Sequence, residues 1–241
     1  MTTKTLIVGA SGGIASALIH QCASRGDDVF AVTRGSVSTD SGASNITYIQ
    51  LAEQDDKHIA SFIEQLREDG VVLNTVIITT GFLHDENKKI HPEKRLEDVR
   101  EDALETYFAV NTIIPSLWIK HLVNVMDKND ATLVCLSARV GSISDNGLGG
   151  WYGYRASKAA LNMFVKTASV EYQRRLKHAL LVCYHPGTVD TSLSKPFQKN
   201  VAAKKLFTPD FTAKQLLSHL SSLNREQTCH FIDWDGQVVT W

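Results

Sequence analysis

The chain has 241 residues, of which 43% are hydrophobic, and its formal net charge at pH 7 is −1. This size suffices for one large core, so we expect a single domain spanning residues 1–241. The numbers of basic and acidic residues are nearly equal, so the charge does not indicate nucleic-acid binding. The N-terminus lacks a signal-peptide core and no apolar run could span a membrane, so we expect a cytoplasmic protein. The four cysteines are scattered and lack metal-ligand spacing, so we expect buried thiols and no metal.

The first predicted element is a strand that leads into a glycine-rich loop. The apolar run Lys4–Val8 is followed at once by Gly9-Ala10-Ser11-Gly12-Gly13-Ile14-Ala15, and a helical pattern then continues to Arg25-Gly26. Such a helix start aims free backbone N–H groups at an anion, and a pyrophosphate fits. Gly9 would permit the turn and Gly13 the close approach. The spacing is not G-x-G-x-x-G, so a plain glycine-rich turn is an equal alternative for the loop alone.

The second predicted strand, Asp28–Thr33, ends at Arg34. Doubly wound folds recognise the adenosine ribose at this place, where an acidic residue accepts the 2′-hydroxyl of NAD and an arginine suits the extra phosphate of NADP. The arginine therefore favours NADP, with NAD less favoured. The alternative is that Arg34 is a solvated residue at the end of a strand.

A long helical run over residues 102–126 contains Pro115, four residues after Asn111. A proline cannot donate the hydrogen bond that would occupy the carbonyl of Asn111. We therefore expect the helix to bend there and to leave that carbonyl for a water or a side chain. The alternative is a buried asparagine that is bonded inside a kinked helix.

Tyr154 and Lys158 lie at the start of a second long helical run, residues 153–173. Four positions apart, their side chains share one helix face. At about 4 Å and an effective dielectric near 20, an ammonium favours a phenolate by roughly 4 kcal/mol. We therefore expect the pKa of Tyr154 to fall toward neutrality, which suits proton exchange with a carbonyl oxygen. An ordinary pair on a surface helix is the alternative.

Two loops are candidates for a substrate site. Residues 82–96 are rich in charge, so we expect a solvated connection with His84 and His91 at the surface. Residues 191–207 carry apolar side chains among lysines and are suited either to close over a hydrophobic carbonyl compound or to cover a partner helix.

Along the whole chain, apolar runs of strand length alternate with helical stretches. Strands are expected near Thr5, Val29, Ile46, Leu73, Leu133 and Leu180, with a last strand over residues 229–232. Thr208-Pro209-Asp210 predicts the start of a helix that runs to about Leu223. The pattern predicts an α/β fold: a single doubly wound Rossmann-type domain with a parallel sheet of about seven strands and helices on both faces.

In this order, the elements resemble the short-chain dehydrogenase/reductase family, and most of all its carbonyl reductases related to C-factor and sniffer proteins. The resemblance rests on the glycine loop, Ile78-Thr79-Thr80-Gly81, Asn111, Tyr154-x-x-x-Lys158 and Pro186-Gly187. It implies an NADP(H) site. The implied cofactor-binding residues are Gly9, Ser11, Gly13, Ile14, Arg34, Thr80, Gly81, Tyr154, Lys158, Pro186, Gly187, Val189 and Thr191.

The carbonyl-orienting serine of the family is where this sequence departs from the pattern. Aligned without gaps, that serine falls at Ala138, and Ser137 comes one residue early. Neighbours on a strand point to opposite faces, so Ser137 can replace it only where the strand ends or bulges. Ser142 is a second candidate. If neither hydroxyl reaches the site, slow turnover or none follows.

The resulting hypothesis is carbonyl reduction, in which NADPH gives hydride to a ketone or aldehyde while Tyr154 donates the proton. By resemblance, Lys158 also bonds the nicotinamide ribose, Asn111 holds the water of a proton relay, and Ser137 orients the carbonyl. The expected partners are a small-molecule carbonyl substrate and further copies of the chain in a homodimer or homotetramer, with neither nucleic acid nor a membrane. A dinucleotide-binding signalling or regulatory protein with little turnover is the alternative, followed by a pure interaction module.

Overall fold

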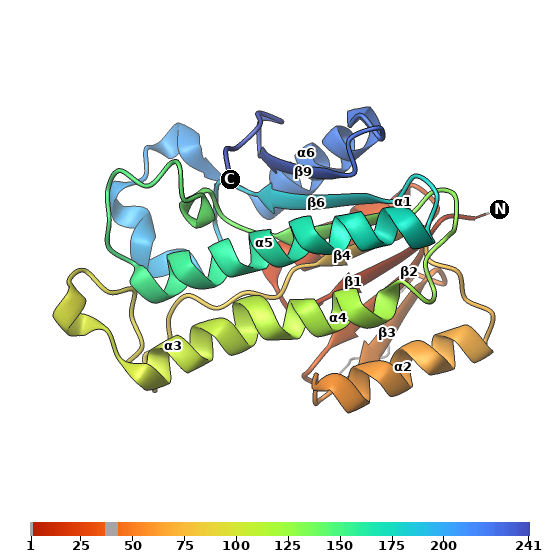
Figure 1. Cartoon of the computed structure of the whole chain (residues 1–241), viewed down its shortest axis with the longest axis horizontal. Coiled ribbons are helices and arrows are strands. Elements are labelled where there is room, and N and C mark those ends of the chain that lie inside the picture. Colours follow the sequence, from red (N-terminus) through yellow and green to blue (C-terminus); the bar gives the residue numbers. More distant parts are fainter. Residues whose placement is uncertain (1, 37–42) are drawn as a thin grey trace.

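A computed structural model describes residues 2–36 and 43–241 and has a central parallel sheet (Figure 1). Its strands are β1 (Lys4–Val8), β2 (Asp28–Thr33), β3 (Ile46–Gln50), β4 (Thr75–Ile78), β5 (Thr132–Leu136), β6 (Leu180–His185) and β9 (Cys229–Asp233). The strand order is β3-β2-β1-β4-β5-β6-β9. The direction of winding therefore reverses between β1 and β4, which is where open α/β sheets bind ligands at the carboxyl ends of their strands. The predicted seven-stranded, doubly wound fold is confirmed.

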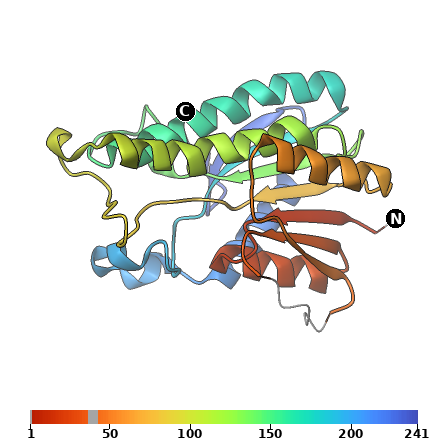
Figure 2. The ribbon, with the colours of Figure 1, turned by 90° about the horizontal axis from the view of Figure 1, so that it is seen from below.

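Helices cover both faces of the sheet, as Figures 1 and 2 show. One face packs against α2 (Asp56–Glu68), α4 (Ile114–Leu122) and α5 (Tyr152–Arg175), and the other packs against α1 (Gly13–Ser24) and α6 (Pro209–Ser222). Leu6 and Val8 lie in the first core, and Ile7 lies in the second. Because both faces are covered, the central strands are apolar on both sides, as buried parallel strands are.

The predicted helix ends are confirmed where local chemistry sets them. Gly26 follows α1 with φ 92°, a conformation that favours glycine. The Thr208 side chain accepts a hydrogen bond from the backbone N–H of Phe211 at 3.1 Å and caps α6. β4 begins at Thr75, two residues after the expected strand centre at Leu73.

The predicted helix over residues 102–126 is divided into three parts. α3 (Glu101–Phe108) passes into the π-helical segment η2 (Ala109–Ile113), and α4 follows and ends at Leu122. The bend expected around Pro115 therefore takes the form of a π-helical turn, in which the N–H of Ile114 bonds to the carbonyl of Ala109. Pro115 then lies in the first turn of α4, where a missing N–H costs little.

Residues 82–96 are only in part the solvated connection that their charge predicts, since Glu86 and Lys88 are exposed. Leu83, Ile90 and Glu93 are buried, and the Tyr107 hydroxyl of α3 donates to the Leu83 carbonyl at 2.9 Å. The apolar residues hidden among the charges pack against α3 and the start of α5. In the part of the chain that the structure describes, no helix has the length and apolar character needed to cross a bilayer.

A short segment after β5, η3 (Arg139–Gly141), packs directly against the first half of α5. A β-carbon at Gly141 would lie 2.8 Å from Cβ of Lys158 and 2.9 Å from its backbone carbonyl carbon. Only glycine allows this approach without displacing the helix.

We expect Gly141→Ala to lower the free energy of unfolding by about 1–3 kcal/mol, because the added methyl overpacks the contact between η3 and α5. The measurement is urea unfolding at neutral pH. The matched control is Gly147→Ala, since no heavy atom lies within 4 Å of a β-carbon there. Equal stability of the two variants would contradict the packing argument.

Candidate active site

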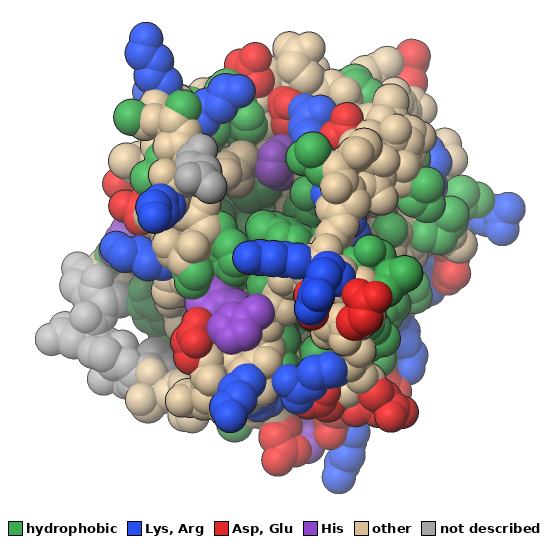
Figure 3. Space-filling model, turned by 90° about the vertical axis from the view of Figure 1, so that its left-hand side faces the viewer, with side chains coloured by type: hydrophobic (Ala, Val, Ile, Leu, Met, Phe, Trp, Pro, Cys, Tyr) green, Lys and Arg blue, Asp and Glu red, His purple; other side chains and the backbone are tan. Residues whose placement is uncertain are grey.

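Two adjoining cavities lie at the carboxyl edge of the sheet. The smaller, about 210 Å³, runs from the glycine loop past Thr80 and Gly81 to Tyr154 and Lys158. The larger, about 380 Å³, lies between the end of β6 and residues 191–207. Figure 3 shows this side of the molecule as a hollow with hydrophobic side chains at its floor and Lys, Arg and His side chains around it. Tyr154 lies on the wall of both cavities.

The glycine loop has the geometry that its sequence predicts. Gly9 has φ 93°, and a β-carbon there would lie 2.6 Å from the hydroxyl oxygen of Thr79. That hydroxyl donates to the carbonyl of Val8 at 2.7 Å and so ties β4 to β1 beneath the loop. A β-carbon at Gly13 would lie 3.1 Å from Cγ2 of Thr191. The loop therefore forms a close-fitting cradle at the N-terminus of α1, which suits a pyrophosphate.

The other predicted cofactor-binding residues are distributed around this cradle. Ile14, Pro186 and Thr191 line both cavities, Gly187 and Val189 line the larger one, and Thr80 and Gly81 line the smaller one. Ser11 is exposed and lies outside both linings. The Thr80 hydroxyl oxygen is buried and has no hydrogen-bond partner within residues 2–36 and 43–241, as expected of a group that contacts a ligand. The residues present therefore fit a dinucleotide.

Arg34 lies at the end of β2 with its side chain exposed. It makes no ion pair with any residue that the structure describes. An arginine left without a carboxylate partner is available to a phosphate, which is consistent with the predicted NADP site.

Helix α5 brings Tyr154 and Lys158 together as predicted. Both side chains are buried, and the Lys158 ammonium donates to the carbonyl of Leu136, the last residue of β5, at 2.9 Å. Nζ of Lys158 lies 5.9 Å from the centre of the Tyr154 ring. A β-carbon at Gly81 would lie 3.7 Å from the same ammonium, so the loop after β4 also borders this pair.

The predicted fall in the pKa of Tyr154 is wrong for this structure. Burial raises the pKa of Tyr154 above its usual value, and burial lowers the pKa of Lys158 to about 8. The ammonium bonds to a backbone carbonyl rather than to the phenol, so loss of hydration dominates for both groups. At neutral pH Tyr154 therefore carries its proton.

Asn111 is fully buried in η2 and joins three segments. Its side-chain oxygen accepts from the N–H of Phe82 at 2.7 Å, and its side-chain nitrogen donates to the carbonyl of Phe82 and to the hydroxyl of Ser157, each at 3.0 Å. The side chain thus ties the loop after β4 to α5 one turn from Tyr154. Its role in a proton relay through the backbone carbonyl stays a prediction.

Both serine candidates for orienting a carbonyl have hydroxyls that bond to other protein groups. Ser137 lines both cavities, but its hydroxyl donates to the side-chain oxygen of Asn162 at 2.6 Å. Ser142 lies outside both linings, and its hydroxyl accepts from the N–H of Asp145 at 3.1 Å. Ala138 lines the larger cavity and packs with Tyr154.

Glu93 holds the start of α5, a role that no sequence pattern predicts. Its carboxylate accepts from the N–H of Gly153 at 3.2 Å, and its backbone carbonyl accepts from the N–H of Trp151 at 2.5 Å. Trp151 precedes α5 in a left-handed conformation with φ 55° and offers no capping side chain. No local signal could identify this cap, because Glu93 lies about 60 residues before the helix.

His84 is half-buried and not fully at the surface as expected, whereas His91 is exposed as expected. The ring of His84 packs edge-on against Phe197 at 5.6 Å between ring centres, and its Nδ1 is buried. Residues 82–96 and 191–207 therefore contact each other beside the larger cavity.

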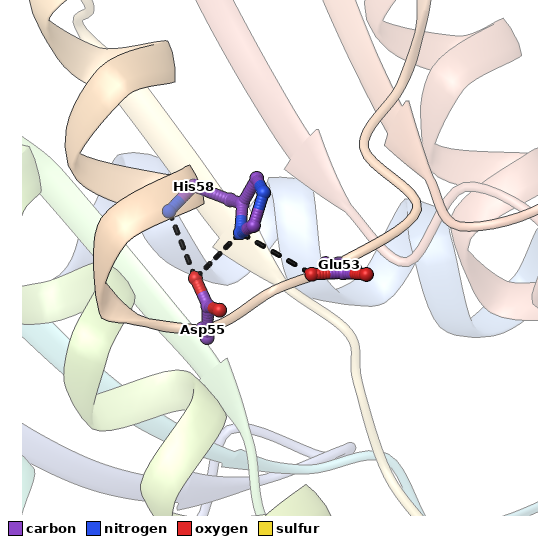
Figure 4. Close-up of side chains that lie close together, drawn as sticks. All are labelled: Glu53, Asp55 and His58. Atoms are coloured by element: carbon purple, nitrogen blue, oxygen red, sulfur yellow. Dashed lines mark hydrogen bonds and ion pairs between the residues drawn. The ribbon is translucent and has the colours of Figure 1, made fainter.

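A separate cluster of Glu53, Asp55 and His58 lies at the start of α2 (Figure 4). Asp55 caps the helix by accepting from the N–H of His58 at 2.9 Å, and Nδ1 of His58 lies 2.7 Å from the same carboxylate. Nδ1 also lies 3.6 Å from a carboxylate oxygen of Glu53. Helix capping explains these contacts, so we assign no ligand to the cluster.

Comparison with known proteins agrees with this geometry. The family model described as short chain dehydrogenase matches residues 3–202. The chain belongs to the short-chain dehydrogenase family. The assignment does not depend on any single motif, because the match extends from β1 past Val201, which lies at the wall of the larger cavity.

Three curated relatives are similar to this chain. A 1-hydroxy-2-glutathionyl-2-methyl-3-butene dehydrogenase of Rhodococcus sp. (strain AD45) is 29% identical, over 99% of this chain and 100% of its own length. A benzil reductase ((S)-benzoin forming) of Bacillus subtilis (strain 168) is 26% identical over 89% and 92%. C-signal of Myxococcus xanthus is 36% identical, but over 44% of this chain and 58% of its own length.

Solved structures show the same fold. Carbonyl reductase Sniffer of D. melanogaster superposes with a TM-score of 0.84 at 20% identity, over the full length of both chains. An NADPH-bound carbonyl reductase from chicken fatty liver superposes with a TM-score of 0.83 at 23% identity, again over both full lengths. The predicted resemblance to this family, including its sniffer-like members, is confirmed.

We expect Lys158→Met to raise the free energy of unfolding at pH 7, because it removes a buried ammonium. The fall in pKa from 10.5 to about 8 corresponds to about 3 kcal/mol, less the cost of leaving the Leu136 carbonyl unpaired. From about pH 8 to 10.5 the folded wild type has lost a proton that its unfolded chain keeps, so wild-type stability rises and the difference should narrow.

Urea unfolding of both proteins at pH 7 and pH 10 measures this difference. The control is Lys57→Met on the exposed side of α2. A difference between Lys158→Met and wild type that stays constant across this range would contradict the assignment.

Proposed function

We propose that this chain is an NADPH-dependent carbonyl reductase that converts a ketone or aldehyde to an alcohol. The observation that carries the proposal is the position of Tyr154, whose side chain lies on the wall of both the cavity beside the glycine loop and the larger, apolar cavity. A group at this junction can reach a substrate oxygen while the substrate carbon faces the cofactor.

Tyr154 acts as the proton donor. When bound, NADPH supplies the hydride that adds to the carbonyl carbon. The phenolic O–H bond of Tyr154 breaks as its proton passes to the carbonyl oxygen, which leaves an alcohol and a phenolate. The raised pKa of buried Tyr154 keeps the phenol protonated until substrate arrives, which is the state that reduction requires.

Lys158 and Asn111 assist this proton transfer without donating the proton themselves. With a pKa of about 8, Lys158 is largely charged at neutral pH, and its ammonium stabilises the phenolate that proton donation leaves behind. We also assign Lys158 to the nicotinamide ribose and the backbone carbonyl of Asn111 to a water that returns a proton from solvent, as the resemblance implies. Asn111 fixes this arrangement through its bond to Ser157 in the same turn of α5.

The cofactor preference rests on Arg34. Its exposed guanidinium, without an ion pair in the described part of the chain, is placed to bind a 2′-phosphate. The presence of NADPH in the similarly folded chicken carbonyl reductase supports this preference.

We propose an apolar, ring-bearing carbonyl compound as the substrate. The larger cavity is walled by Trp151 and Phe197, whose ring centres lie 5.2 Å apart, together with Leu83, Val140 and Val201. Aromatic rings pack well against such walls. The similarity to a benzil reductase supports this substrate class.

We further propose that the chain forms a homodimer or homotetramer through α4 and α5. Ile113, Phe164 and Val170 are exposed there, next to an apolar groove of about 620 Å³ between the two helices. Exposed apolar side chains gathered on adjacent helices mark a surface suited to a second copy.

A second candidate function is dinucleotide-dependent signalling with little turnover. Ala138 at the serine position and the local similarity to C-signal favour it. Cofactor oxidation with a panel of aromatic ketones at saturating NADPH separates the two candidates, since the second predicts binding without oxidation.

We expect Tyr154→Phe to lower kcat by about 100- to 10,000-fold, because the variant has no proton to donate. NADPH affinity, measured by quenching of tryptophan fluorescence, should stay unchanged. Wild-type turnover in the variant would rule out the proposed role.

We expect Arg34→Asp to weaken NADPH binding by about 10- to 100-fold, because a charge-assisted bond to the 2′-phosphate is lost and a repulsive carboxylate is added. NADH affinity should not fall. The measurement is titration of both cofactors against wild type and variant, and equal losses for the two would count against the phosphate contact.

A further inference from the structure

The larger cavity has no serine hydroxyl free to orient a carbonyl. Ala138 offers a methyl group at the place where the family serine falls. The Ser137 hydroxyl is already bonded to Asn162 at 2.6 Å, and a hydroxyl has a single proton to donate. Ser142 lies outside the lining and is engaged with Asp145 and, at 3.4 Å, with the hydroxyl of Thr240. Under the proposed function, a second donor besides Tyr154 must come from elsewhere.

His185 brings a hydrogen-bonding side chain to the wall of the larger cavity. It is the last residue of β6, beside the end of β5, where the N–H of Ser137 bonds to the carbonyl of Tyr184 at 2.8 Å. His185 lines the same cavity as Tyr154 and Ala138. A residue at the carboxyl end of a parallel strand lies at the edge of the sheet where such folds bind ligands.

The imidazole of His185 has no hydrogen-bond partner among the residues that the structure describes. Its Nδ1 is shielded from solvent and unbonded, and Nε2 makes no hydrogen bond to any residue in the described ranges. Other histidines of the chain do bond: Nε2 of His219 lies 3.1 Å from the carbonyl of Trp234, and Nε2 of His230 lies 2.9 Å from that of Asn224. Shielded polar groups are rarely left unpaired, so an unpaired ring nitrogen at a cavity wall points to a ligand.

We propose that a ring nitrogen of His185 donates a hydrogen bond to the carbonyl oxygen of the substrate and so takes the place of the missing serine hydroxyl. The inference rests on the proposed carbonyl reduction. In this role His185 orients the carbonyl and stabilises the negative charge that develops on its oxygen, while Tyr154 transfers the proton.

The charge state of the ring suits this task. Burial, and next the nearby Arg139 guanidinium, lower the pKa of His185 to about 4, against the opposing effect of Asp233 and Asp145. At neutral pH the ring is therefore uncharged, with one N–H to donate. A neutral imidazole can polarise a carbonyl without competing with Tyr154 for the proton-donor role.

The test compares two variants that fill similar space and differ in the donor. His185→Gln keeps an N–H group, whereas His185→Met does not. With NADPH and benzil as the probe substrate, we expect kcat/KM to fall by about 100- to 1,000-fold in His185→Met and much less in His185→Gln. NADPH affinity should be unchanged in both. The control is His91→Ala at an exposed histidine outside the cavity.

A rescue distinguishes an orienting role from a structural one. We expect Ala138→Ser to restore activity in the His185→Met background, because a hydroxyl then lies at the family position. Equal losses in the Gln and Met variants, or a His185→Met enzyme as active as wild type, would overturn the inference. If the wild type reduces benzil and Tyr154→Phe is inactive, either of these two results contradicts the role of His185 and leaves the proposed carbonyl reduction standing. A wild type that binds no NADPH and reduces no member of an aromatic ketone panel overturns the proposed function itself.

Discussion

The hydrogen bond from the Lys158 ammonium to the carbonyl of Leu136 joins α5 to the end of β5 at the meeting point of the two cavities. A charge buried this far from water is costly, and only a fixed acceptor and close packing make it tolerable. Gly141 provides that packing, since its backbone lies directly against Lys158. The position of Tyr154, one helical turn earlier, follows from the same contact. The geometry of the site is thus set by the fold of β5 and η3 as much as by α5.

Segments far away in the sequence hold the first turns of α5 in place. Glu93 supplies the acceptor for the N–H of Gly153, and Asn111 connects Ser157 to the loop after β4. Both residues are buried. Glu93 lies in the loop after β4 and Asn111 lies in η2, and each bonds to α5, the helix that carries Tyr154 and Lys158. The chain therefore builds one rigid frame around Tyr154 from three segments.

The features that the sequence predicts correctly are those set by residues adjacent in the chain. The strands, the glycine loop and the Thr208 cap depend on neighbours along the chain, so their residues identify them. The pKa of Tyr154 could not be predicted, because it depends on how completely the cavity walls exclude water. The direction of the Ser137 hydroxyl and the buried side of residues 82–96 likewise depend on tertiary contacts. His185 had one available signal, its place at a strand end before Pro186-Gly187.

The four cysteines have a practical consequence. Cys22, Cys135, Cys183 and Cys229 are all unpaired and buried, and burial raises the pKa of each thiol. Cys135 and Cys183 are direct neighbours on β5 and β6, so neither can be reached without separating the centre of the sheet. The native molecule thus presents no nucleophilic sulfur to an alkylating agent, and the rate at which iodoacetamide modifies Cys135 and Cys183 reports how often the centre of the sheet opens.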